Sequence, residues 1–170
     1  LPHGTYSAAL QVADPAAANN PRIVELTLNV TNTFSVPGEY PTIQVAIDAT
    51  SIPGDQVVVA NGVYTGVGNR DLDFHGKAIV VRSAGGDPVA SIIDCQGGGR
   101  GFYFHSYETA ASIVEGLTVR NGHMATSEGG GVYCFNAGPT LANCAISGNA
   151  ASRGGGVSGN HSFPVLTGCR

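Results

Sequence analysis

The sequence predicts an all-β fold: a right-handed, single-stranded parallel β-helix (solenoid) with a short N-terminal cap helix and an N-terminal extended strand arm. Three observations predict it. Short motifs recur at a nearly constant spacing, Gly is the commonest turn former with 25 copies, and charged residues make up only 12% of the 170-residue chain. Short strands that repeat in this way, with no helix in the repeating unit, are typical of a β-solenoid.

The repeats are clearest in the last third of the chain. The motif Gly-Gly-Gly-Val-Tyr-Cys at 129–134 recurs as Gly-Gly-Gly-Val-Ser-Gly at 154–159. Pro-Thr-Leu-Ala-Asn-Cys at 139–144 recurs with the same offset as Pro-Val-Leu-Thr-Gly-Cys at 164–169. We expect each strand to lie about 4.8 Å from its equivalent in the next coil, so that backbone groups pair between coils.

The preceding coil carries weaker copies of the same motifs. Residues 101–104 match 131–134, and residues 114–119 match 141–146, with offsets slightly longer than that of the last two copies. Loop lengths therefore vary between coils while the strands keep their register. The apolar residues expected to face inward and to form a stacked column are Val132, Leu141, Ile146, Val157 and Leu166.

A short helix is predicted ahead of the repeats. Within residues 40–49, Thr42 is a candidate N-cap, and the three apolar residues Ile43, Ala46 and Ile47 fall on one helical face. A helix in this position would cover the first coil, as the terminal cap of a solenoid does. Strands are predicted to follow at 56–60 and 77–82.

A family resemblance appears when the motifs are taken together. Val-Pro-Gly-Glu-Tyr-Pro-Thr-Ile-Gln at 36–44, Gly54-Asp55 and Val-Ala-Asn-Gly-Val-Tyr at 59–64, followed by the triple-glycine repeats, resemble bacterial secreted right-handed β-helix repeat proteins of the pectin-lyase-like superfamily. The resemblance implies a parallel β-helix domain over residues 36–170. Because that superfamily includes polysaccharide lyases, hydrolases and members without known activity, it implies no single function.

Residues 1–35 are expected to form an N-terminal arm with one or two strands. The segment 23–34 alternates apolar and polar residues as a half-buried strand does, 6–13 is a second candidate strand, and 14–21 is a linker. Two interpretations are open: both strands pack on their own solenoid, or one pairs with a neighbouring molecule by strand addition. The apolar residues of this candidate polymerisation arm are Leu10, Val12, Val24, Leu26, Leu28 and Val30.

The other end of the sequence motivates an assembly hypothesis. The sequence stops at Arg170, inside a repeat and without a capping helix, and an open last coil would expose unpaired backbone groups and an apolar column. Three explanations are open: the chain is a fragment, the end frays, or another subunit covers it head to tail. The apolar residues expected in this open-end coil are Val157, Val165 and Leu166.

No catalytic residues and no cofactor are predicted. Asp71 and Asp73, with His75 beside them, are weak candidates for metal binding or acid–base work, because on a strand all three side chains would point to one side. Cys144 and Cys169 occupy equivalent positions in successive coils and are candidates for a disulfide or for a ladder of free thiols. The stacked aromatic residues belong either to the core or to an outer face that stacks on sugar rings, and they are Phe102, Tyr103, Phe104, Tyr133 and Phe135.

Charge and hydropathy disfavour two classes of partner. The formal net charge is −4 without a basic patch, which argues against nucleic acid. No apolar run approaches the ~18 residues of a membrane-spanning helix, so membrane insertion is not expected. A first residue other than Met is typical of a trimmed chain, and with four Cys and one Lys it favours an extracellular or cell-surface location.

The function hypothesis is therefore non-catalytic. We expect an extracellular structural protein that joins copies of itself head to tail into a filament or surface layer, through the arm and the open ends of the β-helix. The alternatives are a polysaccharide lyase or hydrolase, which would depend on Asp71 or Asp73, and a glycan-binding or adhesion module. Polysaccharide is accordingly the second candidate partner, after other copies of the chain.

Overall fold

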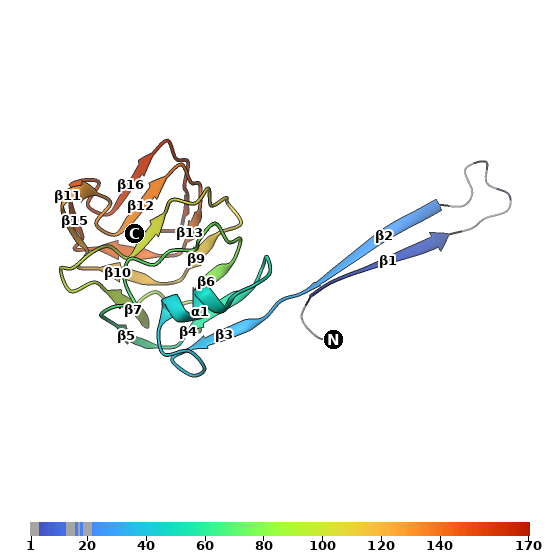
Figure 1. Ribbon diagram of the computed structural model, residues 1–170, viewed down its shortest axis with the longest axis horizontal. Coiled ribbons are helices and arrows are strands. Elements are labelled where there is room, and N and C mark those ends of the chain that lie inside the picture. The colour runs from blue at the N-terminus through green and yellow to red at the C-terminus, as the bar shows by residue number, and fades with distance from the viewer. Residues whose placement is uncertain (1–3, 13–15, 17, 19–21) are drawn as a thin grey trace. The chain divides into compact units, whose positions relative to one another are not determined.

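The computed structural model describes residues 4–12, 16, 18 and 22–170 of the chain. The chain divides into two compact units, Leu1–Asn32 and Thr33–Arg170, which are drawn in Figure 1 and are described separately below. The break falls ahead of the expected boundary at residue 35, because residues 33–36 form the first strand of the solenoid.

The second unit is a parallel β-solenoid of about five turns, as the repeats predict. Within the described residues its strands form three stacked parallel sheets and one further pair. The longest sheet holds β3 (Thr33–Val36), β4 (Gln56–Val59), β6 (Val80–Ser83), β9 (Ile113–Glu115), β13 (Thr140–Ala142) and β17 (Val165–Thr167). The second holds β5 (Gly62–Tyr64), β7 (Ser91–Asp94), β10 (Thr118–Arg120) and β14 (Ala145–Ser147). The third holds β8 (Phe102–Phe104), β12 (Val132–Phe135) and β16 (Val157–Asn160), and the pair is β11 (His123–Glu128) with β15 (Ala150–Arg153).

The register of the strands matches the offsets in the sequence. Val132 of β12 pairs with Val157 of β16 in the next coil and with Phe102 of β8 in the preceding coil. Leu141 of β13 pairs with Val114 of β9 in the same way. Connections of different length therefore leave the ladder of equivalent strands intact, and the expected alignment of the repeats is confirmed.

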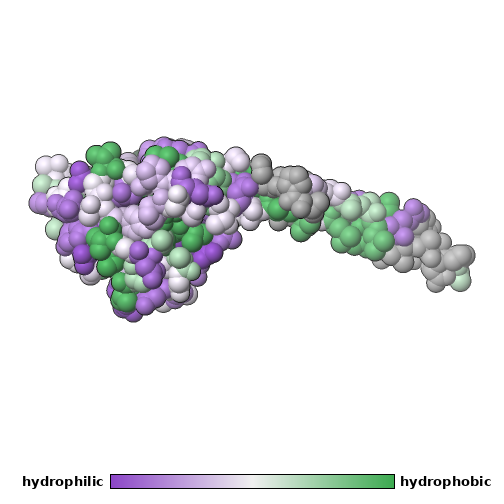
Figure 2. Space-filling view, turned by 90° about the horizontal axis from the view of Figure 1, so that it is seen from below, coloured by the Kyte–Doolittle hydropathy of each residue, from purple (hydrophilic) through white to green (hydrophobic). Residues whose placement is uncertain are grey.

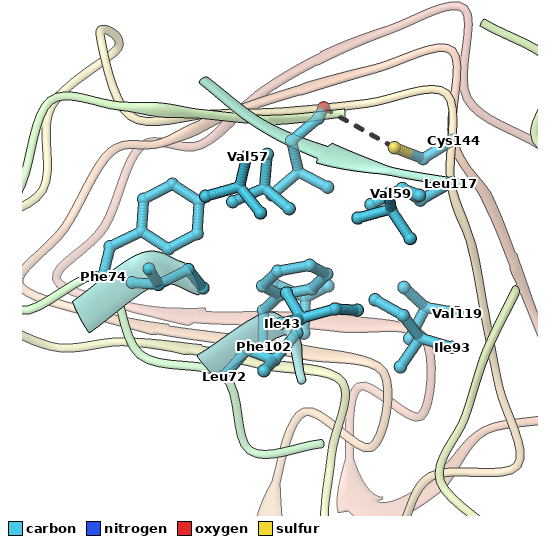
Figure 3. Close-up of a cluster of buried hydrophobic side chains, with 14 of the residues drawn as sticks. Ile43, Val57, Val59, Leu72, Phe74, Ile93, Phe102, Leu117, Val119 and Cys144 are labelled. Atoms are coloured by element: carbon cyan, nitrogen blue, oxygen red, sulfur yellow. Dashed lines mark hydrogen bonds between the residues drawn. The ribbon is translucent and has the colours of Figure 1, made fainter. Parts of the chain in front are cut away.

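Alternate residues of the strands point inward and build one core. Phe74, Phe102 and Phe104 are fully buried, and the rings of Phe74 and Phe104 meet edge to face with their centroids 5.0 Å apart. Figure 3 shows Phe74 and Phe102 beside aliphatic side chains that come from the helix and from several strands. Burying a side chain of this size contributes roughly 1.5–3 kcal/mol, so the stacked apolar interior is the main source of stability.

Helix α1 (Ile43–Ala49) forms where the sequence predicts a cap. Thr42 is its N-cap, and the Thr42 hydroxyl accepts a hydrogen bond from the Val45 amide at 3.4 Å. Such a bond satisfies one of the four amides that a helix start leaves unpaired. The helical face that is fully buried in the core consists of Ile43, Ala46 and Ile47, as predicted.

Lys77 binds the other end of this helix. Its ammonium group donates hydrogen bonds to the carbonyl oxygens of Ile47, Asp48 and Thr50 at 2.8, 3.0 and 3.0 Å. The last carbonyls of a helix lack intrahelical partners and attract cations. The strand predicted over 77–82 begins only at Val80, after Lys77.

The described part of the first unit is an antiparallel hairpin. β1 (Gly4–Val12) pairs with β2 (Arg22–Val30) along its full length, from Gly4 opposite Val30 to Val12 opposite Arg22. The sequence predicts strand in both segments but not that they pair with each other. The strand expected over 23–34 ends at Val30, because the residues from Thr33 onward pair with β4 instead.

Candidate functional site

The hairpin separates apolar from polar side chains. Directly opposed residues of an antiparallel pair lie on the same face, and Leu10 opposes Val24, with Leu26 and Leu28 following on that face at alternate positions of β2. These four residues, called here the apolar hairpin face, are 45–53% exposed. Figure 2 shows apolar surface along the hairpin. Because a two-stranded hairpin is at best marginally stable alone in water, this face is expected to need a cover.

The remaining predicted arm residues lie at one end of the register. Val30 is half-buried and opposes Gly4, whereas the side chain of Val12 lies outside the described residues. The opposite face of the hairpin is polar at Glu25 and Thr27, as alternation predicts, with the exposed Ile23 as an apolar exception. The apolar character of the arm is therefore concentrated on one face.

The last described coil of the solenoid, residues 156–170, exposes a second apolar surface. Val165 and Leu166 of β17 are both nearly half exposed. Among the described residues β17 pairs only with β13 and β16 only with β12, so each strand has a free ladder edge. A hollow of about 240 Å³, called here the exposed-coil hollow, is lined by Ile146, Gly156, Val157, Leu166, Cys169 and Arg170.

The predicted inner column loses burial toward this coil. Val132 and Leu141 are each 1% exposed, Val157 is partly buried, and Leu166 is 49% exposed although it pairs directly with Leu141. In a solenoid each inward residue is covered by the coils on both sides, and Leu166 lacks one of them within the described chain. Val165 is adjacent to Leu166 in β17 and therefore points to the outer face.

The acidic run around Asp71 does not form the predicted strand. The backbone φ is 51° at Asp71 and 53° at His75, and these left-handed values interrupt an extended strand at both ends of the run. Leu72 makes only an isolated bridge, to Phe102 of β8. The alternation of burial is kept: Leu72 and Phe74 are fully buried, whereas Asp71 and His75 are exposed and Asp73 is half-buried.

The carboxylates of this run are engaged in local contacts. Asp73 Oδ2 lies 3.0 Å from His75 Nδ1 and 3.0 Å from His105 Nε2. Asp71 Oδ1 accepts a hydrogen bond from the Arg100 amide at 2.9 Å. In the part of the chain that the structure describes, no group of three or more His, Cys, Asp or Glu is arranged to hold a metal ion. The contacts with His105 and Arg100 join neighbouring coils, whereas the contact with His75 lies within one coil.

The stacked aromatic residues divide between the core and the outer face of the solenoid. Phe102 and Phe104 belong to the core, whereas Tyr103 and Tyr133 are half-buried on the outer face. The two tyrosine rings are stacked, with centroids 5.5 Å apart and planes at 9°. The Arg100 guanidinium carbon lies 4.7 and 5.0 Å from the two centroids, within the range of cation–π attraction.

A polar hollow adjoins this tyrosine pair. It has a volume of about 600 Å³ and is lined by Thr126, Ser127, Glu128, Tyr133, Ser152 and Arg153. Glu128 and Arg153 are not among the site residues predicted from the sequence. A signal was present: each residue immediately precedes a triple glycine, so opposite charges occupy the same repeat position in successive coils.

All four cysteines are free thiols, and three are buried. The Arg170 amide donates to the Cys144 carbonyl at 3.0 Å, which places Cys144 and Cys169 in neighbouring rungs, as the repeats predict. Burial raises the pKa of the Cys95 and Cys134 thiols to about 12, and that of Cys144 to about 11. The arrangement is that of a thiol ladder rather than of a disulfide.

These thiols are expected to differ in reactivity. In the folded chain a disulfide-exchange reagent should modify about one thiol quickly, the half-exposed Cys169, because the buried thiols hold their protons at neutral pH and are shielded. After unfolding in denaturant all four should react. A colorimetric thiol assay with and without denaturant measures both numbers, and only two reactive thiols after unfolding would instead indicate one disulfide, which peptide mapping would assign.

Comparison with known proteins adds no assignment. No protein-family model, no curated protein and no solved structure matches the chain. The parallel β-solenoid is shown by the structure. The superfamily membership that the motifs imply is not supported by any of these comparisons. Helix α1 is too short to cross a membrane, and the described residues contain no other helix that is long and apolar enough to do so.

Proposed function

We propose that the chain is a non-catalytic, extracellular structural protein, a right-handed β-helix that joins copies of itself head to tail into a filament or surface layer. One observation carries the proposal: the apolar hairpin face presents four large aliphatic side chains, each about half exposed, on a unit too small to be stable alone. An apolar face of this kind on a soluble protein usually marks an interaction surface.

The exposed coil of a second copy supplies what this face lacks. The exposed-coil hollow offers an apolar surface that includes Leu166 and Val157, and β16 and β17 each have a second ladder edge that no strand of the described residues occupies. A hairpin that docks there would extend a sheet by strand addition and would cover the hollow with its leucines. Both surfaces belong to the same chain, so one type of molecule can provide donor and acceptor.

The geometry of such a contact favours a polymer. The donor hairpin and the acceptor coil are different surfaces, so the contact is heterologous, and heterologous contacts produce open filaments when the rotation between copies does not close a ring. Helix α1 packs on β3 and β4, the first strands of the longest sheet, and buries Ile43, Ala46 and Ile47 in the core. Direct stacking of one solenoid on another through bare ends is therefore disfavoured, and the hairpin is the better donor.

The contacts of the acidic residues support a role without catalysis. Asp71 accepts a hydrogen bond from the Arg100 amide, and Asp73 lies between His75 and His105, so both aspartates have contacts that hold the coils in place. The extracellular location rests on composition and on the resemblance of residues 36–170 to bacterial secreted β-helix proteins. The proposal needs neither a cofactor nor a membrane-spanning segment.

The proposal predicts that one charge on the apolar hairpin face abolishes assembly. Leu26→Lys places an ammonium group where an apolar contact is required, and burying an unpaired charge costs several kcal/mol, so the dissociation constant of the assembly should rise more than about tenfold. Thr27→Lys is the matched control, because it adds the same charge at the adjacent residue of β2, on the polar face of the hairpin. Sedimentation velocity over a range of concentrations measures the outcome.

The expected pattern is growth of the wild-type chain and of Thr27→Lys with concentration, while Leu26→Lys stays monomeric. A wild-type chain that sediments as a monomer at every concentration would refute the proposal. So would equal assembly of the two lysine variants, because the apolar face would then be irrelevant.

A further inference from the structure

We propose that the polar hollow beside Tyr133 is a binding site for a neutral oligosaccharide. The site lies on the outer face of the solenoid between β11, β15 and β12, and it is independent of the hairpin on which the proposed assembly depends. Its lining combines the aromatic ring and hydroxyl of a tyrosine, three aliphatic hydroxyl groups, one carboxylate and one guanidinium. That combination of an apolar platform with convergent polar groups is the usual make-up of a small-ligand site.

An irregularity in the strand pair builds the hollow. His123 and Met124 of β11 pair with Ala150 and Ala151 of β15, but the next pair is Glu128 with Arg153. Between these two pairs β11 contains more residues than β15, so β11 has a bulge. Bulges redirect side chains and are frequent beside binding sites, and here the bulge leads into Ser127 and Glu128 at the wall of the hollow.

The charged pair in the hollow suits hydroxyl groups. Glu128 Oε1 lies 3.3 Å from Arg153 Nη1, and Glu128 Oε2 accepts a hydrogen bond from Ser158 Oγ at 2.9 Å. A carboxylate has about four acceptor positions and a guanidinium five donors, so both groups retain capacity, and the Arg153 side chain is 81% exposed. A sugar hydroxyl donates and accepts at once, and the adjacent carboxylate and guanidinium provide one partner for each role.

Arg100 supports the wall of the hollow from the inner side. The residue is only 5% exposed, and its Nε atom is one of two buried side-chain nitrogen or oxygen atoms without a hydrogen-bond partner among the described residues. Its Nη2 donates to Ser127 Oγ at 3.2 Å, and its guanidinium packs near Tyr133, so it adjoins two residues that line the hollow. Arg100 does not itself line the hollow, so its contribution is to hold Ser127 and Tyr133 in position from behind.

Charge decides between neutral and acidic ligands. The charges of Glu128 and Arg153 in the lining cancel, so the hollow has no excess charge of its own to attract an ionic sugar, and the net charge of −4 of the whole chain opposes an anionic one at long range. The single guanidinium that is well exposed in the hollow is already paired with Glu128. The ring of Tyr133 offers the apolar contact that the carbon–hydrogen face of a hexose needs.

Calorimetric titration of the full chain with neutral hexose oligosaccharides, built from glucose, mannose or galactose, tests the proposal. Saturable binding to at least one of them is expected, and Tyr133→Ala should weaken it by at least about tenfold, the size typical of a central aromatic contact. Tyr107→Ala is the matched control, because Tyr107 is 76% exposed and does not line the hollow. Its affinity should equal that of the wild-type chain.

Glu128→Gln is the second variant, and it keeps the size of the side chain while removing its charge and one acceptor. It should also weaken binding, and its thermal unfolding should stay close to that of the wild-type chain because Glu128 is not in the core. Absence of saturable binding to every neutral oligosaccharide would overturn the proposal. Equal affinities in the Tyr133 and Tyr107 variants, or binding confined to hexuronate oligomers titrated in parallel, would overturn it as well.

Discussion

Replacing Phe102 by Ala is expected to lower the free energy of unfolding of the solenoid by about 3–5 kcal/mol. Phe102 is fully buried, stacks parallel to Phe104 with centroids 6.0 Å apart, and meets Phe74 edge to face at 6.2 Å. Removal of the ring leaves a cavity between coils and also ends two aromatic contacts. Because a domain of this size is stable by only about 5–15 kcal/mol, this one change removes a large share.

Denaturant titration followed by circular dichroism measures the loss. The neighbouring substitution Tyr103→Ala is the control, since Tyr103 belongs to the same strand but points outward and is half-buried. It should cost clearly less than Phe102→Ala. If the two substitutions cost the same, the alternation of inner and outer residues along β8 would be refuted, and with it the position of the core.

Replacing Gly130 by Ala is expected to cost about 3 kcal/mol or more, the upper range for overpacking. A Cβ atom at Gly130 would press against the carbonyl oxygen of Ala150 and lie 2.8 Å from the carbonyl oxygen of Gly155. Both obstacles are backbone atoms of the next coil, which cannot move without disturbing the ladder. The triple glycine at 129–131 is thus required by the close approach of successive coils.

Gly85→Ala is the matched control for this substitution. No heavy atom lies within 4 Å of a Cβ built at Gly85, so the added methyl group meets no obstacle and restricts the unfolded chain. Its stability should be unchanged or higher by about 0.4–1 kcal/mol. Equal destabilisation by both alanines in thermal and denaturant unfolding would show that the glycines matter through backbone freedom and not through contact between coils.

The repeats predict most of the solenoid because each coil obeys the same constraint. The offsets between the motifs, which vary slightly from coil to coil, translate directly into the pairs Val132–Val157, Leu141–Val114 and Val132–Phe102. Pairing between coils leaves no choice of partner once the motifs are aligned. The cap helix is equally predictable, since Thr42 and its apolar face are local signals.

Features that depend on tertiary contact escape the same reasoning. Alternation around Asp71 looks like a strand, but left-handed backbone at Asp71 and His75 leaves no signature in apolar periodicity. Lys77 sits in an apolar run, and only the position of α1 shows that it binds the carbonyls of a helix end. Alternation does not predict the pairing of β1 with β2, because it defines a strand but not its partner.

The candidate sites were predictable in part for the same reason. The apolar residues of the arm follow from alternation, and all four of the apolar hairpin face were expected from the sequence. Glu128, Arg153 and Arg100 come together only through the bulge in β11 and through the stacking of coils. Local sequence does not reveal such a juxtaposition unless the repeats are first aligned in register.

Cross-linking between copies tests the head-to-tail contact most directly. Leu26→Cys puts a thiol on the apolar hairpin face, and Cys169 lines the exposed-coil hollow of the next copy. If the hairpin docks in that hollow, mild oxidation should yield a ladder of covalent multimers on a non-reducing gel, because the two thiols can approach within disulfide distance. The ladder should vanish in Leu26→Cys combined with Cys169→Ser. Monomers alone, or multimers that persist without Cys169, would contradict the account.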